Sequence, residues 1–350
     1  MMIMSRVVRT ALLAAVAALL LAACAGTPDS RGSAAESWTA RHQAALAEAK
    51  LVPEPAAYEI RYFNWVDRDR QREVLAKLYL PPAASATPAP LVVFSHGLGG
   101  SREGYSYLGA NWAARGYASL HVQHAGSDSR LWGGNPFEVV TRLQSAATEA
   151  EAVDRVRDLR FALDQAFAAP GLGGRLDPAR IVAAGHSYGA NTVLLAAGAV
   201  FERPQGKLSY AEPHLAGAVV ISAPPFHGEA DAEAIVRPIG IPTLHITATG
   251  DDIRLPGYQS GYEDRVRVFT ATGSPRKALV VFRDGAHSMF TDRLAPGGRD
   301  LNVQVKGATL DLSLAFLDEV VGGRRGAFGE RSASHGELIS RLESSLGGMR

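Results

Sequence analysis

Short continuous apolar runs recur along the chain from residue 91 to residue 321, and stretches with helical spacing separate them. The run at 91–95 has the length and composition of a strand buried on both faces, and the helical stretch 104–115 follows it. Further strands are predicted at 118–122, 180–184, 216–221, 243–247 and 278–282, and further helices at 137–167, 188–200 and 303–321. Strands that alternate with helices in this way form a mostly parallel sheet with helices on both faces.

The chain on either side of this region has a different pattern. Two runs, 58–65 and 74–80, predict an antiparallel hairpin at the leading edge of the sheet. Glycine and arginine at 322–326 interrupt the helical pattern, so we expect residues 322–350 to form a loosely attached tail. With 47% hydrophobic and 20% charged residues, the composition is that of a globular protein. We therefore predict one α/β domain over residues 56–321.

The first residues have the pattern of an export signal. Arg6 and Arg9 precede an apolar run, 11–23, that is shorter than the roughly 20 residues needed to cross a bilayer. The run ends at Cys24, which is the only cysteine, so the chain forms no internal disulfide.

Residues 21–24, Leu-Ala-Ala-Cys, resemble the lipobox of bacterial lipoproteins. The resemblance implies that 1–23 are a signal peptide and that Cys24 is lipidated. Ala25 at the next position, in place of an aspartate, implies the outer membrane. An ordinary signal peptide with a chance cysteine is the alternative. We expect an exported protein held to the bacterial cell envelope by a lipid, with residues 24–55 as a flexible tether.

The sequence Gly185-His186-Ser187-Tyr188-Gly189 lies between a predicted strand and a predicted helix. A sharp strand-to-helix turn crowds both of its flanks, so a side chain at 185 or 189 would clash. Such a turn projects the Ser187 hydroxyl above the sheet, next to a helix N-terminus that favours negative charge. We interpret Ser187 as a nucleophile; the alternative is a glycine-rich turn with a capping serine.

A serine hydroxyl needs a base to act as a nucleophile at neutral pH. His287 follows the predicted strand 278–282 in a loop of small residues, which suits a base that reaches Ser187. The acid that orients such a base is expected after the preceding strand, where Asp251 and Asp252 lie. We favour Asp252, because the run 252–256 resembles the acid loop of many esterases of the α/β-hydrolase fold; Asp251 is the alternative.

A glycine-rich loop, Ser95-His96-Gly97-Leu98-Gly99-Gly100, follows the first predicted parallel strand. Acyl transfer needs hydrogen-bond donors directed at the developing oxyanion. The backbone N–H groups of Leu98 and Tyr188 are the candidate donors, because glycines beside them let the backbone approach a substrate.

Residues 94–105 and 121–124, with the turn at Gly185, resemble the predicted dienelactone-hydrolase family of bacterial α/β-hydrolases, which is similar to the platelet-activating-factor acetylhydrolases. The resemblance covers roughly residues 91–321. It implies the α/β-hydrolase fold and an esterase whose oxyanion donors follow His96-Gly97 and the nucleophile. True dienelactone hydrolases use a cysteine nucleophile, whereas this chain has Ser187, so the family name does not give the substrate.

The residues therefore predict a serine esterase that hydrolyses carboxylic esters through an acyl-enzyme and needs no cofactor. A lipase or polyester hydrolase of the same fold, a peptidase of that fold, and a non-catalytic binding lipoprotein are the alternatives. His121 and His124 are three residues apart, but carboxylates nearby are few, so no metal site is expected. A net charge of +1 gives no support for a nucleic-acid partner.

The shape of the cleft also has a signal in the sequence. Only about twenty residues separate the strands that end at 221 and begin at 243, too few for a separate cap domain. An open cleft is therefore predicted, which favours small or exposed ester substrates over long buried acyl chains. Trp132 and Phe137 are candidates for a wall of the acyl pocket, and core packing is the alternative for both.

Overall fold

The computed structural model describes residues 51–83, 87–133, 135, 138–172, 174–229, 231–255 and 258–347. The predicted signal peptide, Cys24 and the tether as far as residue 50 lie outside the described residues. Within the described ranges, no helix is long and apolar enough to cross a membrane.

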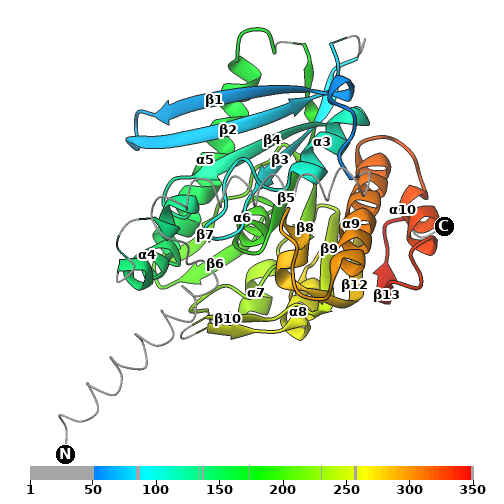
Figure 1. Ribbon diagram of the computed structural model, residues 1–350. Coiled ribbons are helices and arrows are strands. Elements are labelled where there is room, and N and C mark those ends of the chain that lie inside the picture. The colour runs from blue at the N-terminus through cyan, green and yellow to red at the C-terminus, as the bar shows by residue number, and fades with distance from the viewer. Residues whose placement is uncertain are drawn as a thin grey trace, which may run out of the picture.

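A twisted sheet of nine strands forms the centre of the described chain (Figure 1). Its six central strands are parallel, and β1, β2 and β13 run antiparallel to their neighbours. The predicted leading hairpin is confirmed as β1 and β2, at one edge of the sheet. In spatial order the strands are β1 (Glu59–Asp67), β2 (Arg72–Leu80), β4 (Ala118–His124), β3 (Ala89–Ser95), β5 (Leu176–His186), β8 (Leu215–Ile221), β9 (Thr243–Gly250), β12 (Lys277–Ala286) and β13 (Ile339–Ser344).

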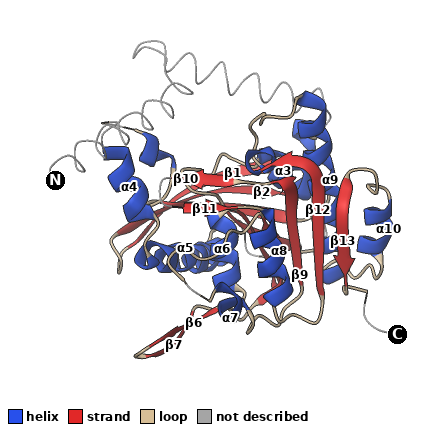
Figure 2. Cartoon of the chain, turned by 90° about the horizontal axis from the view of Figure 1, so that it is seen from below, coloured by secondary structure: helices blue, strands red, loops and turns tan. Residues whose placement is uncertain are grey.

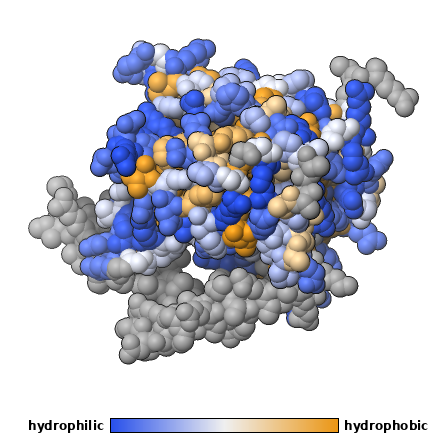
Figure 3. Space-filling view, turned by 90° about the horizontal axis from the view of Figure 1, so that it is seen from above, coloured by the Kyte–Doolittle hydropathy of each residue, from blue (hydrophilic) through white to orange (hydrophobic). Residues whose placement is uncertain are grey.

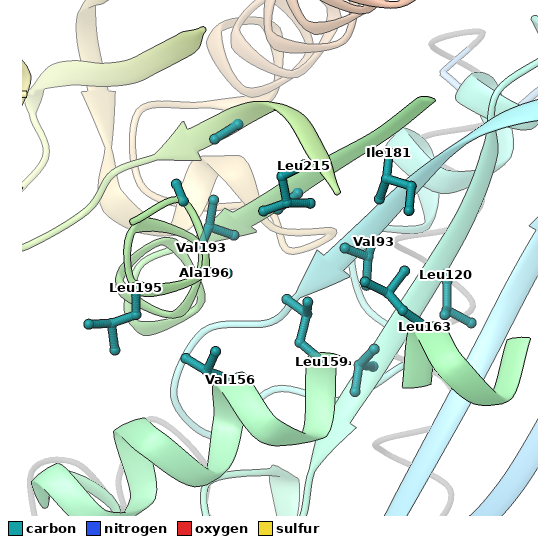
Figure 4. Close-up of a cluster of buried hydrophobic side chains, with 14 of the residues drawn as sticks. Val93, Leu120, Val156, Leu159, Leu163, Ile181, Val193, Leu195, Ala196 and Leu215 are labelled. Atoms are coloured by element: carbon teal, nitrogen blue, oxygen red, sulfur yellow. The ribbon is translucent and has the colours of Figure 1, made fainter. Parts of the chain in front are cut away.

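Helices cover both faces of this sheet, as Figure 2 shows. Alternate residues of β3 point to opposite faces: Val93 belongs to the core under α5 (Glu149–Ala168) and α6 (Tyr188–Ala196), whereas Phe94 belongs to the core under α3 (Ser106–Ala114) and α9 (Arg299–Val320). Figure 4 shows the first core, in which side chains of α5 and α6 meet those of the strands. The helices α7 (Ala232–Val236) and α8 (Tyr262–Ala271) lie on the α5 side, and α10 (Ala327–Ala333) packs on α9.

The predicted helix 137–167 is two helices in the structure, α4 (Val139–Ala146) and α5. Thr148 separates them, and its hydroxyl accepts a hydrogen bond from the backbone N–H of Glu151 at 3.3 Å. A threonine at this position caps a new helix start, which explains the break. Two small hairpins were not predicted: β6 (Val200–Arg203) with β7 (Gly206–Ser209), and β10 (Ile253–Leu255) with β11 (Tyr258–Ser260).

The prediction that the C-terminal segment is loosely attached was wrong. The strand β13 pairs with β12, and the preceding helix α10 packs on α9 (Figure 1). Phe328 and Leu346 are 1% and 2% exposed and belong to the core under α9. The domain therefore extends past residue 321 to at least residue 346.

Exposed apolar side chains concentrate on the leading hairpin. Ile60, Tyr62 and Val66 of β1 are between 42% and 55% exposed. The face of the molecule on that side, seen in Figure 3, shows hydrophobic residues among hydrophilic ones. Exposed apolar residues are ordinary on a protein surface and are by themselves no evidence of a partner.

The strand order reverses at β3, which has β4 on one side and β5 on the other. In open parallel sheets, the crevice at the carboxyl ends of the strands on either side of such a reversal is where ligands bind. The loop after β3 and the turn after β5 both begin at this point.

Candidate active site

Ser187 lies in a strained turn between β5 and α6. Its backbone has φ 56° and ψ −124°, which is rare for a residue with a side chain. A Cβ at Gly189 would overlap the carbonyl oxygen of Ser95, and one at Gly185 would overlap the carbonyl oxygen of Gly189. The prediction that both glycines are required sterically is confirmed. The surrounding packing thus holds Ser187 in a conformation that it would not adopt alone.

His287 reaches Ser187 from the carboxyl end of β12. It is the first residue of the short helix η4 (His287–Phe290), and its Nε2 lies 2.9 Å from the Oγ of Ser187. The carbonyl oxygen of His287 lies 3.1 Å from Nε2 of His186, so His186 ties the histidine loop to the turn at Ser187.

The aspartate next to His287 is Asp251, not Asp252. Oδ1 of Asp251 lies 2.7 Å from Nδ1 of His287, and Asp251 is fully buried. The side chain of Asp252 is exposed and accepts a hydrogen bond from Arg254 at 3.0 Å. The preference for Asp252 was therefore wrong as a matter of geometry. Asp251 directly follows β9, and its N–H donates to the carbonyl of Ala248 in the turn at this point. This turn directs the carboxylate of Asp251 inward and that of Asp252 outward.

Four side chains surround the carboxylate of Asp251. Thr247 donates to its Oδ2 at 2.7 Å, and a guanidinium nitrogen of the buried Arg265 lies 3.5 Å from its Oδ1. Burial raises the pKa of Asp251, but the charges of His287 and Arg265 and the hydroxyl of Ser222 outweigh it and hold that pKa well below its usual range. The carboxylate is thus kept ionised.

Sequence reasoning missed Ser222, which follows β8 directly. Its Oγ lies 2.7 Å from Nδ1 of His287, and the residue is fully buried with φ 53°. Arg265 was missed as well. Neither residue belongs to a local motif, and a strand end followed by serine was the only signal for Ser222.

The two candidate oxyanion donors flank Ser187. Tyr188 is the first residue of α6, and Leu98 lies in the loop after β3. Among the described residues, no hydrogen-bond acceptor is assigned to the backbone N–H of either. The Leu98 loop is fixed on both sides, because Gly97 N–H donates to Tyr105 Oη at 3.3 Å and Gly99 N–H donates to the Ser127 carbonyl at 2.8 Å.

Four buried histidines, His96, His121, His124 and His186, bond to nearby backbone and side-chain groups. Burial lowers the pKa of each, to about 3 for His121, so they are neutral at physiological pH. In the described part of the chain, no cluster of three or more His, Cys, Asp or Glu residues is arranged to hold a metal ion.

Trp132 lies against the glycine-rich loop 95–100, which is the candidate oxyanion loop. Its Nε1 donates to the carbonyl of Gly99 at 3.0 Å, and the residue is 53% exposed. A Cβ at Gly99 would overlap the indole ring, so the ring lies directly on this loop. Phe137, the other predicted wall residue, lies outside the described residues. The described part of the segment between β8 and β9 contains one short helix, α7, in place of a cap.

Comparisons with known proteins agree with this architecture. Residues 71–131 match the family model of platelet-activating factor acetylhydrolase, isoform II. The solved structure of a ferulic acid esterase from Streptomyces cinnamoneus is similar, with a TM-score of 0.57 at 22% identity, and the match covers 85% of this chain and 96% of that one. The fold is that of the α/β-hydrolases. The structure of a puromycin hydrolase is also similar, with a TM-score of 0.53 at 17% identity over 77% of this chain and 40% of that chain.

A platelet-activating factor acetylhydrolase of Cavia porcellus is 28% identical over 32% of this chain and 33% of its own length. This chain therefore matches about one third of that relative. These similarities in sequence and in fold are to hydrolases, and the matched residues 71–131 include the glycine-rich loop after β3 and end one residue before Trp132.

Proposed function

We propose that the protein is a serine hydrolase that cleaves carboxylic esters, with Ser187 as nucleophile, His287 as general base and Asp251 as the residue that orients it. One observation carries the proposal: Ser187, His287 and Asp251 form a continuous chain of contacts of 2.9 Å and 2.7 Å on a strained turn. A buried, ionised aspartate on one side of an imidazole and a hydroxyl on the other is the arrangement that activates serine.

In the first half of the proposed reaction, Ser187 attacks the ester carbonyl as its proton passes to Nε2 of His287. The backbone N–H groups of Leu98 and Tyr188 donate to the oxyanion of the tetrahedral intermediate. His287 then returns the proton to the leaving alcohol, and an acyl-Ser187 ester remains. Water repeats the sequence with His287 as base, which releases the acid and regenerates Ser187.

Small acyl groups suit this site best. In the described part of the segment between β8 and β9, one short helix stands in place of a cap domain, so we expect little apolar surface around a long acyl chain. The name of the Cavia porcellus relative points the same way, since an acetylhydrolase removes a two-carbon acyl group. We infer that acetyl and other short-chain esters are the substrate class, and that the half-exposed indole of Trp132 contacts the substrate near the oxyanion loop.

The lipobox-like sequence at the N-terminus supports a proposal for the cellular location of the protein. We propose that Cys24 carries a lipid that holds the domain at the cell envelope, which would bring it to ester substrates at a membrane surface. Metabolic labelling with a clickable fatty acid tests this, because label on the wild type should be lost in Cys24→Ala.

A fluorophosphonate probe tests the catalytic proposal directly. The chain without residues 1–24 should be labelled at Ser187, as mapped by mass spectrometry, and labelling should be lost in Ser187→Ala and His287→Ala. Hydrolysis of p-nitrophenyl esters should fall as the acyl chain lengthens from two to twelve carbons. A folded wild type that takes no label would mean that the protein is a non-catalytic binding lipoprotein, and a preference for long chains would favour a lipase.

A further inference from the structure

Arg155 is a fully buried arginine on α5 that the reaction described above does not use. Its guanidinium makes four hydrogen bonds, all to uncharged oxygens. Nε donates to Thr192 Oγ1 at 2.9 Å, Nη1 donates to Ser127 Oγ at 2.6 Å, and Nη2 donates to Ser95 Oγ at 3.0 Å and to the carbonyl of His96. The partners lie on three separate segments: the end of β3, the loop after β4, and α6.

These three segments hold the two candidate oxyanion donors. Leu98 lies two residues after His96, and the N–H of its neighbour Gly99 donates to the carbonyl of Ser127. Tyr188 begins α6, and its ring stacks against the guanidinium of Arg155 at 4.5 Å from ring centroid to Cζ. Thr192 Oγ1, which accepts from Arg155, also donates to the carbonyl of Tyr188 at 3.2 Å. The side chain of Arg155 therefore contacts both segments that carry a candidate oxyanion donor.

The charge of Arg155 makes this placement costly. Among the described residues, no carboxylate lies within ion-pairing distance of its guanidinium. Two acids whose charges act on Arg155, Glu151 and Asp158, are hydrogen-bonded to Arg72. Glu151 is connected to Arg155 through the hydroxyl of Ser127, and Asp158 through His124 and then Ser95. Burial lowers the pKa of Arg155 to about 10, so the group stays charged at neutral pH. A buried cation without a direct ion pair is expensive for folding.

We propose that Arg155 is a positioning residue that fixes the spacing of the two oxyanion donors, and that its planar fork of donors is what the site requires. This inference rests on the proposed function, because it assigns a role to Arg155 only if Leu98 and Tyr188 bind an oxyanion. Arginine suits the role because five donors in one plane can join three segments at fixed angles, which a single ammonium cannot do.

The variant Arg155→Lys keeps the charge and removes the fork. Loss of one oxyanion donor costs about 100-fold in kcat in other hydrolases, and we expect a similar fall in kcat for p-nitrophenyl acetate, with KM within threefold of the wild type. The rate of fluorophosphonate labelling should fall to a similar extent. Because Ser187, His287 and Asp251 are unchanged in this variant, the midpoint of the acid limb of the pH–rate profile should stay the same. Displacement of His287 or Asp251 would move that midpoint.

Two further variants separate positioning from general damage. Thr192→Val removes one acceptor at nearly constant volume and should lower kcat by about tenfold. Arg157→Lys, on the exposed side of the same helix, is the matched control and should leave kcat and KM unchanged. Thermal melting establishes that each variant is folded at the assay temperature.

The outcomes distinguish this inference from the proposed function. An active wild type with folded Arg155→Lys and Thr192→Val variants that keep kcat within threefold would overturn the role of Arg155 and leave the esterase proposal intact. A shifted acid limb in Arg155→Lys would also overturn it, since the effect would then act through the triad. A wild type that takes no probe would refute the esterase proposal itself.

Discussion

Asp251 Oδ1 lies 2.7 Å from Nδ1 of His287, while the neighbouring carboxylate of Asp252 faces solvent beside Arg254. Two adjacent aspartates in one turn therefore have different surroundings. The first is buried and held ionised by surrounding donors and charges, and the second is an exposed surface group. This difference gives a prediction that uses each residue as the control for the other.

Asp251→Asn should lower kcat by about 10⁴-fold, because an amide cannot accept from His287 in the same way and favours the wrong tautomer. Asp252→Asn should change kcat by less than twofold. Steady-state kinetics on p-nitrophenyl acetate measures both. Equal activity of the two variants would contradict the assignment, and loss in Asp252→Asn alone would restore the acid that the sequence favoured.

The sequence alone was sufficient to predict the turn at Ser187, the position of His287 and the glycine-rich loop after β3. Each follows a strand of the central sheet, and buried parallel strands appear as continuous apolar runs. It was not sufficient for the choice between Asp251 and Asp252, because a shift of one residue at a strand end reverses which side chain faces inward. Resemblance to a loop with proline at 256 favoured the second aspartate, and only the turn after β9 determines which one faces inward.

Two other features had little or no signal in the sequence. Ser222 and Arg265 meet Asp251 only in the folded chain, from segments 29 and 14 positions away in the sequence. The strand β13 has one buried residue, Ile339, and five exposed ones, so it lacks the apolar run by which the other strands were found. Edge strands are commonly polar in this way, since a charged edge discourages pairing with other chains.

The hydroxyl of Ser222 should contribute to catalysis through His287. Its Oγ lies 2.7 Å from Nδ1 of His287, and its hydroxyl also helps to hold the pKa of Asp251 below its usual range. Hydrogen bonds to charged groups contribute about 1.5–3 kcal/mol, so Ser222→Ala should lower kcat/KM by roughly 10- to 100-fold. Ser274→Ala is the control, because Ser274 is also buried but precedes the opposite end of β12. Unchanged kcat/KM in a folded Ser222→Ala variant would show that the hydroxyl is dispensable.

The C-terminal elements should contribute to the stability of the whole domain. Phe328 is 1% exposed and packs in the core under α9, so Phe328→Ala should lower the free energy of unfolding by about 3–5 kcal/mol. Leu342 on β13 is 43% exposed, and Leu342→Ala should lower it by less than about 0.5 kcal/mol. Urea denaturation measures both. If Phe328→Ala were as mild as Leu342→Ala, the segment would be loosely attached after all.

Lys306 should make stability depend on pH in the alkaline range. It is fully buried on α9, where its Nζ donates to the carbonyl of Arg293 at 2.9 Å, and burial lowers its pKa from 10.5 to about 8. Between these two values the unfolded chain binds a proton that the folded chain does not, so the free energy of unfolding rises with pH in that window. A shift of this size corresponds to about 3 kcal/mol.

The comparison between wild type and Lys306→Met isolates this contribution, because other titrating groups act equally on both. Relative to the variant, the wild type should gain stability from pH 8 to pH 10 in urea denaturation, whereas below pH 8 the difference should be constant, since the lysine is then protonated in both states. Lys207→Met, at an exposed lysine, should show no such slope. A flat difference between wild type and Lys306→Met from pH 7 to pH 10 would mean that Lys306 keeps its ordinary pKa and that water reaches its ammonium group.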